Sequence, residues 1–201
     1  YLSPFTRYQQ EKFLKLWLVV SNLNNLLPYL SRPINLIIIF SIVYVFSLPP
    51  FGVSIFYYIS FSIIFYNILT NDNFSKKYIF YFFLFTQIIT LSWITQSFYS
   101  GGFGYLFLGI ILVGVLSLFI AFLYYSATIL ILVTFKKKIL QIFLLPLGLS
   151  IVEILKEFIF GGFPWNPSAI IYYKNIWILK SLPFFGVYGL GLVINLIVGL
   201  I

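Results

Sequence analysis

Residues Tyr78 to Phe135 read YIFYFFLFTQIITLSWITQSFYSGGFGYLFLGIILVGVLSLFIAFLYYSATILILVTF, and no charged side chain interrupts them. At about 20 residues per bilayer crossing, the stretch is long enough for nearly three crossings. The motif SGGFG at Ser100–Gly104 divides it, because glycine favours turns and left-handed backbone over a continued helix. The stretch therefore predicts two membrane-spanning helices joined by a short loop, at about 78–98 and 105–135.

The composition of the whole chain indicates a membrane protein. Of its 201 residues, 62% are hydrophobic and 8% are charged, and the mean hydropathy is +1.06; these values exclude an ordinary soluble domain. The chain has no Cys and no His, which excludes disulfides, thiolate nucleophiles and the usual general base, and we expect neither a metal nor a cofactor. The net charge of +8 comes from short basic clusters between apolar runs, so it indicates membrane topology rather than a nucleic-acid partner.

Apolar runs on both sides of the long stretch predict further spans. Leu48-Pro49-Pro50-Phe51-Gly52 breaks the first apolar region, because proline lacks the amide donor and clashes with the preceding turn. We therefore predict an all-α fold, a polytopic integral membrane helix bundle with about six transmembrane helices. The expected spans are about 34–48, 53–69, 78–98, 105–135, 139–160 and 181–201.

The chain divides into two predicted parts. Residues 1–32 form an N-terminal cytoplasmic or interfacial segment, and residues 33–201 form the transmembrane domain. Within the first part, Phe13–Val20 is too short to cross a bilayer and is either an interfacial helix or a weakly ordered tail. The chain opens on Tyr1 and contains no Met, so we expect it to lack its true start or to have been cut from a larger protein.

The basic residues predict the orientation, since cytoplasmic loops of membrane proteins are enriched in Lys and Arg. Most of them fall before the first span, after the second or after the fourth, which places the N-terminus in the cytoplasm. The loops PPFG, SGGFG and GGFPWNP lack basic residues and are expected to face outward. The basic residues on the cytoplasmic side are Arg7, Lys12, Lys15, Arg32, Lys76, Lys77, Lys136, Lys137 and Lys138.

Glu153, Lys156 and Glu157 are the ionisable groups within a predicted span. Their spacing places them on one helical face, where the lysine can pair with either carboxylate. Ionisable groups cost about 2.5 to 3.5 kcal/mol each at the centre of a membrane helix, so they normally face a cavity or the bundle interior. Three interpretations stay open: a polar recess for a lipid head group, a support for an outer loop, or an ion pair that only satisfies itself.

The loop Gly161–Pro167 reads GGFPWNP and combines two glycines, two prolines and a tryptophan. Such a turn is rigid and presents Trp165 at the outer interface, although an interfacial tryptophan also occurs as a simple anchor. Gly186, Gly189 and Gly191 lie within an apolar span, so we expect them to serve helix packing and not to bind a dinucleotide.

Taken together in this order, several motifs resemble the membrane portion of bacterial apolipoprotein N-acyltransferases. Glu153-Ile-Leu-Lys156 leads into GGFPW, and Phe185–Leu200 (FGVYGLGLVINLIVGL) follows. Upstream, Leu91-Ser-Trp93-Ile94 with Gly101-Gly102 resembles the family's third span and its outer loop, and Leu48–Phe51 (LPPF) resembles the turn after its first span. The resemblance covers about Ile34 to Ile201; Glu157 and Asn166-Pro167-Ser168 depart from the family pattern.

The resemblance implies a multi-pass acyltransferase of the bacterial inner membrane. Such an enzyme moves an acyl chain from a phospholipid to the N-terminal diacylglyceryl-cysteine of a lipoprotein, through a thioester in a nitrilase-like domain with a Glu-Lys-Cys triad. No catalytic residue of that triad is in this chain, so we expect a fragment or split form that is inactive alone. The residues expected to shape the lipid mouth are Gly162, Phe163, Pro164, Trp165, Glu153, Lys156 and, more weakly, Trp93.

The alternative is a noncatalytic polytopic membrane protein, such as a transporter or channel subunit. Glu153 and Lys156 would then lie on a substrate path. Transporters usually carry broken helices in paired repeats, and the sequence has no such repeat. The charged pair also lies close to the GGFPW loop and away from the bilayer midplane, which favours the acyltransferase interpretation.

Overall fold

The computed structural model describes residues 32–71, 74–162 and 166–201. These residues form helices and connecting turns without a strand, which confirms the predicted all-α fold. The chain separates into two compact units, Tyr1–Leu36 and Ile37–Ile201. Of the first, only Arg32 and the start of helix α2 are described, so the interfacial helix predicted at Phe13–Val20 lies outside the described residues.

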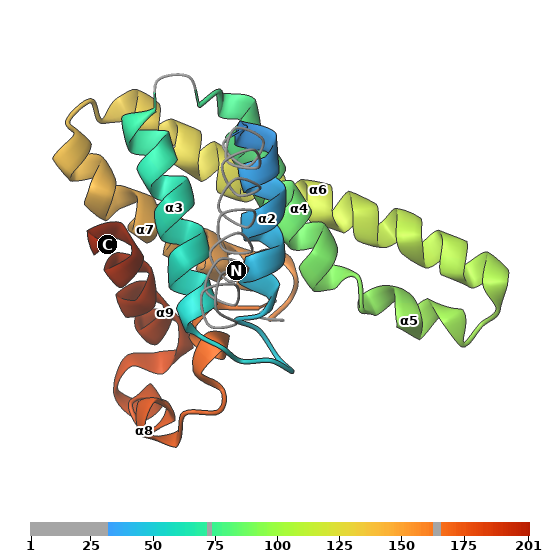
Figure 1. Ribbon diagram of the computed structural model, residues 1–201. Coiled ribbons are helices and arrows are strands. Elements are labelled where there is room, and N and C mark those ends of the chain that lie inside the picture. Colours follow the sequence, from blue (N-terminus) through green and yellow to red (C-terminus); the bar gives the residue numbers. More distant parts are fainter. Residues whose placement is uncertain (1–31, 72–73, 163–165) are drawn as a thin grey trace, which may run out of the picture. The chain divides into compact units, whose positions relative to one another are not determined.

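Helices follow one another along the whole described chain, separated by short turns (Figure 1). Their bounds are α2 Pro33–Val45, α3 Ile55–Thr70, α4 Lys76–Leu91, α5 Ile94–Tyr99, α6 Phe103–Thr134, α7 Lys138–Ile159, the 3₁₀ helix η1 Ser168–Tyr172, α8 Ile176–Leu179 and α9 Leu182–Leu200.

Among the described residues, four helical segments are long and apolar enough to cross a membrane: α4 with α5, then α6, α7 and α9. Helices α2 and α3, with 13 and 16 residues, are shorter and also apolar. The predicted polytopic helical bundle is confirmed. Each expected span falls on one of these helices, apart from the third, which is divided between α4 and α5 by a turn at Ser92 and Trp93.

The long helix α6 organises the neighbouring helices. Helices α4 and α5 both pack along it, and α7 packs against it too and also contacts α9. At 1.5 Å per residue, the 32 residues of α6 extend about 48 Å, well beyond a hydrocarbon core of about 30 Å. Figure 1 shows the consequence: α5 and the N-terminal part of α6 project together beyond the other helices. Large apolar side chains on this projection are exposed, including Phe103, Tyr105 and Phe107.

Aromatic rings fill the interior of the bundle. Phe61 of α3 meets Phe82 of α4 edge to face with 5.4 Å between ring centroids, and Phe83 stacks on Tyr124 of α6 at 5.1 Å. Aromatic pairs at these separations are each worth about 0.5–1.5 kcal/mol beyond the area they bury. The rings therefore join α3, α4 and α6 from the inside.

Helices α7 and α9 approach each other closely at Gly199. Pro146 lies inside α7, so the carbonyl of Ile142 has no amide donor one turn later. A Cβ atom at Gly199 would collide with this carbonyl oxygen and would lie 2.8 Å from Cγ of Pro146. Only glycine allows this approach, which is typical of packing between membrane helices.

The glycines of the FGVYGLGL motif have different roles. A Cβ at Gly191 would lie 3.1 Å from a carboxylate oxygen of Glu153, in agreement with the packing role expected from the sequence. Gly186 differs from that expectation, because it has φ of 67° and ψ of 175° and interrupts α9 with a kink. A Cβ added there would have no atom of the described residues within 4 Å. Left-handed backbone of this kind favours glycine.

Candidate functional site

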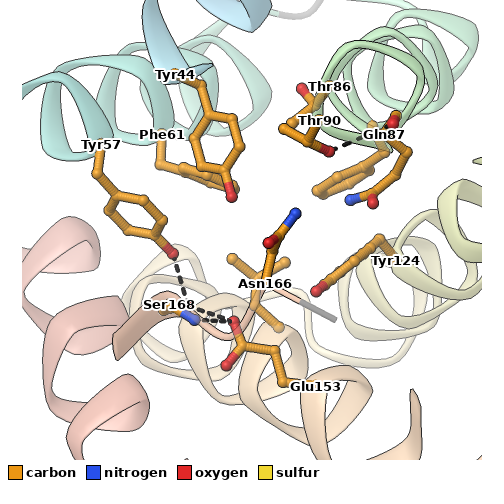
Figure 2. Close-up of a pocket in the computed structure, with 12 residues that line it drawn as sticks. Tyr44, Tyr57, Phe61, Thr86, Gln87, Thr90, Tyr124, Glu153, Asn166 and Ser168 are labelled. Carbon is orange, nitrogen blue, oxygen red and sulfur yellow. Dashed lines mark hydrogen bonds between the residues drawn. The ribbon is translucent and has the colours of Figure 1, made fainter. Parts of the chain in front are cut away.

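Glu153 of α7 points into the bundle and is almost completely buried. Its Oε1 accepts hydrogen bonds from the backbone amide of Ser168, at 3.1 Å, and from the Ser168 hydroxyl. Ser168 is the first residue of η1, just beyond the Gly161–Pro167 loop. These two hydrogen bonds fix the segment that follows the loop to the wall of α7 (Figure 2).

The hydrogen-bond network continues into α3 and α9. The Tyr57 hydroxyl of α3 donates to Oδ1 of Asn195. The Ser168 hydroxyl oxygen lies 3.0 Å from the Tyr57 hydroxyl oxygen and 3.1 Å from Oδ1 of Asn195. The Asn195 amide donates to Ser150 of α7 at 2.9 Å. Asn195 is fully buried. Such a network of satisfied buried groups rigidifies its surroundings, and here it links α3, α7, η1 and α9.

Next to the network lies a polar cavity of about 20 Å³. This volume is enough for one water molecule and far too small for an acyl chain. The second carboxylate oxygen of Glu153, Oε2, is buried and has no hydrogen-bond partner among the described residues. Figure 2 shows the lining side chains converging on the cavity from several helices. They are Tyr44, Tyr57, Phe61, Phe83, Thr86, Gln87, Thr90, Tyr124, Leu149, Glu153, Asn166 and Ser168.

Lys156 is also buried but turns toward α6. Its Nζ lies 5.0 Å from the ring centroid of Tyr124, within the range of a cation–π contact. Glu153 thus holds η1, and Lys156 contacts α6 while also interacting electrostatically with Glu153. Of the three interpretations left open by the sequence, the hydrogen bonds of Glu153 favour support of an outer loop.

The other candidates from the sequence are distributed around this site. Gly161 and Gly162 follow the end of α7 at Ile159, and their φ values of 66° and 92° are left-handed and favour glycine. Phe163, Pro164 and Trp165 lie outside the described residues. Trp93 is 57% exposed at the turn between α4 and α5 and does not line the cavity, so the structure does not bring it to Glu153.

A second set of contacts joins the PPFG turn to the segment after η1. Lys174 donates through Nζ to the backbone oxygens of Pro50, at 3.0 Å, and Phe51, at 2.9 Å. The Tyr173 hydroxyl also donates to Pro50 O at 2.7 Å. A Cβ at Gly52, which has φ of 68°, would lie 2.6 Å from Cε1 of Tyr173. Two loops that the sequence predicts on one side of the membrane are therefore held together, and we call residues 50–52 with 173–174 the loop clasp.

Tyr57, Ser168 and Asn195 were not predicted as site residues from the sequence. One signal was available for Asn195, because an amide inside an otherwise apolar span needs a buried partner. Ser168 and Tyr57 gave no comparable signal, since serine and tyrosine are ordinary in membrane helices and at their ends. Within residues 32–71, 74–162 and 166–201, no three His, Cys, Asp or Glu side chains gather as metal ligands.

Comparison with known proteins identifies one family. Its description is Apolipoprotein N-acyltransferase N-terminal domain, and it matches residues 40–200. No curated protein and no solved structure matches the chain. The match covers α6, α7, η1 and α9 with the Glu153 network, and nearly all of the described helices. The chain therefore belongs to the apolipoprotein N-acyltransferase N-terminal domain family.

Proposed function

We propose that this chain is the membrane platform of an enzyme that acylates lipoproteins in the bacterial inner membrane. The acyl donor is a membrane phospholipid, and the acceptor is the amino group of an N-terminal diacylglyceryl-cysteine. The observation that carries the proposal is the attachment of η1 to Glu153, because it fixes the base of the Gly161–Pro167 loop, the motif through which the chain resembles this enzyme family.

The thioester chemistry belongs to a domain outside these residues. A thioester requires a cysteine thiolate, and the 201 residues contain no Cys. The contribution of this chain is therefore positioning: a rigid wall below the reacting groups and a lateral surface along which lipid reaches them. A preorganised wall matters because misplacement of reacting groups by about 1 Å can lower a rate by about 10²-fold.

We assign the mouth of this platform to the loop after α7 together with its buried supports. On the family resemblance we assign Gly162, Phe163, Pro164 and Trp165 to this mouth, with Glu153 and Lys156 as the buried residues that support it. Trp93 is a weaker candidate for the mouth, because it is exposed beside α5 and faces lipid. The orientation that fits this assignment has the N-terminus and Lys136–Lys138 in the cytoplasm and the loop clasp outside.

The small central cavity argues against the transporter alternative. A substrate path for a solute needs continuous space near the charged pair, whereas the cavity beside Glu153 has room for about one water molecule. Tyr57, Ser168 and Glu153 on its wall are joined by hydrogen bonds, as expected for a structural support.

The test is complementation of a bacterium depleted of its own N-acyltransferase. This chain is expressed alone, with a separate nitrilase-like catalytic domain, and as the full natural reading frame that contains it. N-terminal peptides of a reporter lipoprotein are then analysed by mass spectrometry. We expect the third acyl chain only when a catalytic domain is present. Acylation by the chain alone would refute the proposal that catalysis belongs to a separate domain. A complete reading frame that never acylates the reporter would refute the proposed role in lipoprotein acylation.

A further inference from the structure

A second recess lies at the opposite end of α7 from the Glu153 network. It is a groove of about 270 Å³ between α3, the start of α7 and the end of α9, and it is more than ten times larger than the central cavity. The lining residues are Ser62, Phe65, Tyr66, Leu69, Thr70, Lys138, Ile142, Val198, Gly199, Leu200 and Ile201.

The walls of this groove present an apolar surface. Ser62 donates its hydroxyl to the Val198 carbonyl at 3.2 Å, and Thr70 donates to the Tyr66 carbonyl at 2.7 Å. These hydroxyls are already paired within the protein, so they do not require a polar ligand. The close contact at Gly199 forms the floor, because it brings α9 against α7. A hydrocarbon chain matches such a surface.

One end of the groove is basic. Lys138 lines it, and Lys136 and Lys137 are exposed immediately before it in the chain. The acidic side chains among the described residues, Glu153 and Glu157, belong to the other end of α7, about 22 Å or more along the helix at 1.5 Å per residue. An apolar groove with a basic end is complementary to an amphiphile with a negative head group.

We propose that this groove binds an anionic phospholipid, with an acyl chain against α3 and α9 and its phosphate at Lys138. Lys136 and Lys137 strengthen the attraction of the head group from the neighbouring surface. The site is separate from the proposed acyl transfer and does not depend on it. If the lysine cluster is cytoplasmic, as the positive-inside rule indicates, the ligand belongs to the inner leaflet.

The test uses native mass spectrometry of the purified chain and of the full natural polypeptide. Each is titrated in detergent with phosphatidylglycerol and with phosphatidylcholine carrying the same acyl chains. We expect tighter binding of phosphatidylglycerol, and Lys138→Gln should weaken it about fivefold, the effect of one lysine near an anionic surface. Lys77→Gln is the matched control, because it removes the same charge from a residue that does not line the groove. Equal binding of the two lipids, or equal effects of the two variants, would overturn the proposal.

A second variant tests the acyl chain separately from the phosphate. Leu69→Trp fills the groove, and we expect it to weaken lipid binding while the melting temperature in detergent without added lipid stays close to that of the wild type. Inorganic phosphate is titrated in parallel, and we expect it not to compete at lipid concentrations. Competition by phosphate alone, unchanged lipid binding in the folded Leu69→Trp protein, or a full polypeptide that binds no lipid would each contradict an acyl chain in the groove.

Discussion

Replacing Ser168 by alanine should weaken the attachment of η1 to α7. The substitution removes the hydroxyl that donates to Glu153 but leaves the Ser168 amide bonded to the same oxygen. Tyr57 and Asn195 still pair with each other. The loss is thus the bond from this hydroxyl to a buried acceptor, and removing one partner of a buried hydrogen bond costs about 1–3 kcal/mol. We expect the free energy of unfolding to fall by about 2 kcal/mol, or close to 30-fold in the ratio of folded to unfolded protein.

The chain offers a matched control in Ser117 of α6. Its hydroxyl is fully buried, but it has no hydrogen-bond partner among the described residues. Ser117→Ala removes the same atoms without breaking a bond, so we expect no loss of stability, or a small gain. Reversible unfolding in mixed micelles, followed by circular dichroism, measures both variants. Equal effects of Ser168→Ala and Ser117→Ala would refute the role of the hydrogen bond.

A second measurement separates local release of η1 from general destabilisation. Since the chain has no cysteine, Asn166→Cys supplies a single thiol beside the anchor. Adding Ser168→Ala should raise its rate of maleimide labelling under native conditions, because the segment keeps only the amide bond to Glu153 and opens more often. Adding Ser117→Ala should leave the rate unchanged. An unchanged rate in the Ser168→Ala background would mean that the amide bond alone holds η1.

Three further predictions concern the loop and its surroundings. In the complete enzyme, Trp165→Ala should lower acyl transfer more than membrane insertion or abundance, and unchanged transfer would leave Trp165 as an interfacial anchor. Single cysteines placed between Phe160 and Tyr172 should react with an impermeant maleimide from the outer side, whereas labelling only from the cytoplasm would overturn the orientation. Gly52→Ala should lower the free energy of unfolding by about 1–3 kcal/mol, because the backbone is left-handed and the added methyl meets Tyr173. The control is Gly114→Ala inside α6, where the added methyl has no atom of the described residues within 4 Å. It should raise the free energy of unfolding by roughly 0.5–1 kcal/mol, measured in the same micelles.

The helices were predictable because their ends carry chemical signals. Lysines begin α4 and α7, and glycine or proline motifs lie between α2 and α3 and before α6. The fourth span, expected at 105–135, corresponds to Phe103–Thr134. The turn at Ser92 and Trp93 was missed, since neither residue breaks a helix by itself. Local sequence therefore determined where helices begin and end, apart from this division of the third span.

The partners within the network could not be predicted in the same way. Tyr57 is separated from Ser168 by 111 positions and from Asn195 by 138, and nothing in either local sequence identifies the other residue. Helical periodicity gives no help, because helices such as α6 are apolar on all sides and have no polar face to orient them. Glu153 could be recognised as a candidate site residue from its acidic side chain and its depth in the predicted span. Its hydrogen-bond partner could not be recognised, because the packing of separate helices brings that residue to it.

The bond between Tyr57 and Asn195 also has a consequence for biogenesis. Helix α3 is synthesised well before α9, so Tyr57 enters the membrane before its amide partner exists. Until α9 arrives, Ser150 and Tyr57 both lack the Asn195 side chain that joins them in the finished bundle. Unsatisfied polar groups in hydrocarbon are unfavourable, so the packing of α9 against the earlier helices supplies a partner that those helices need inside the membrane.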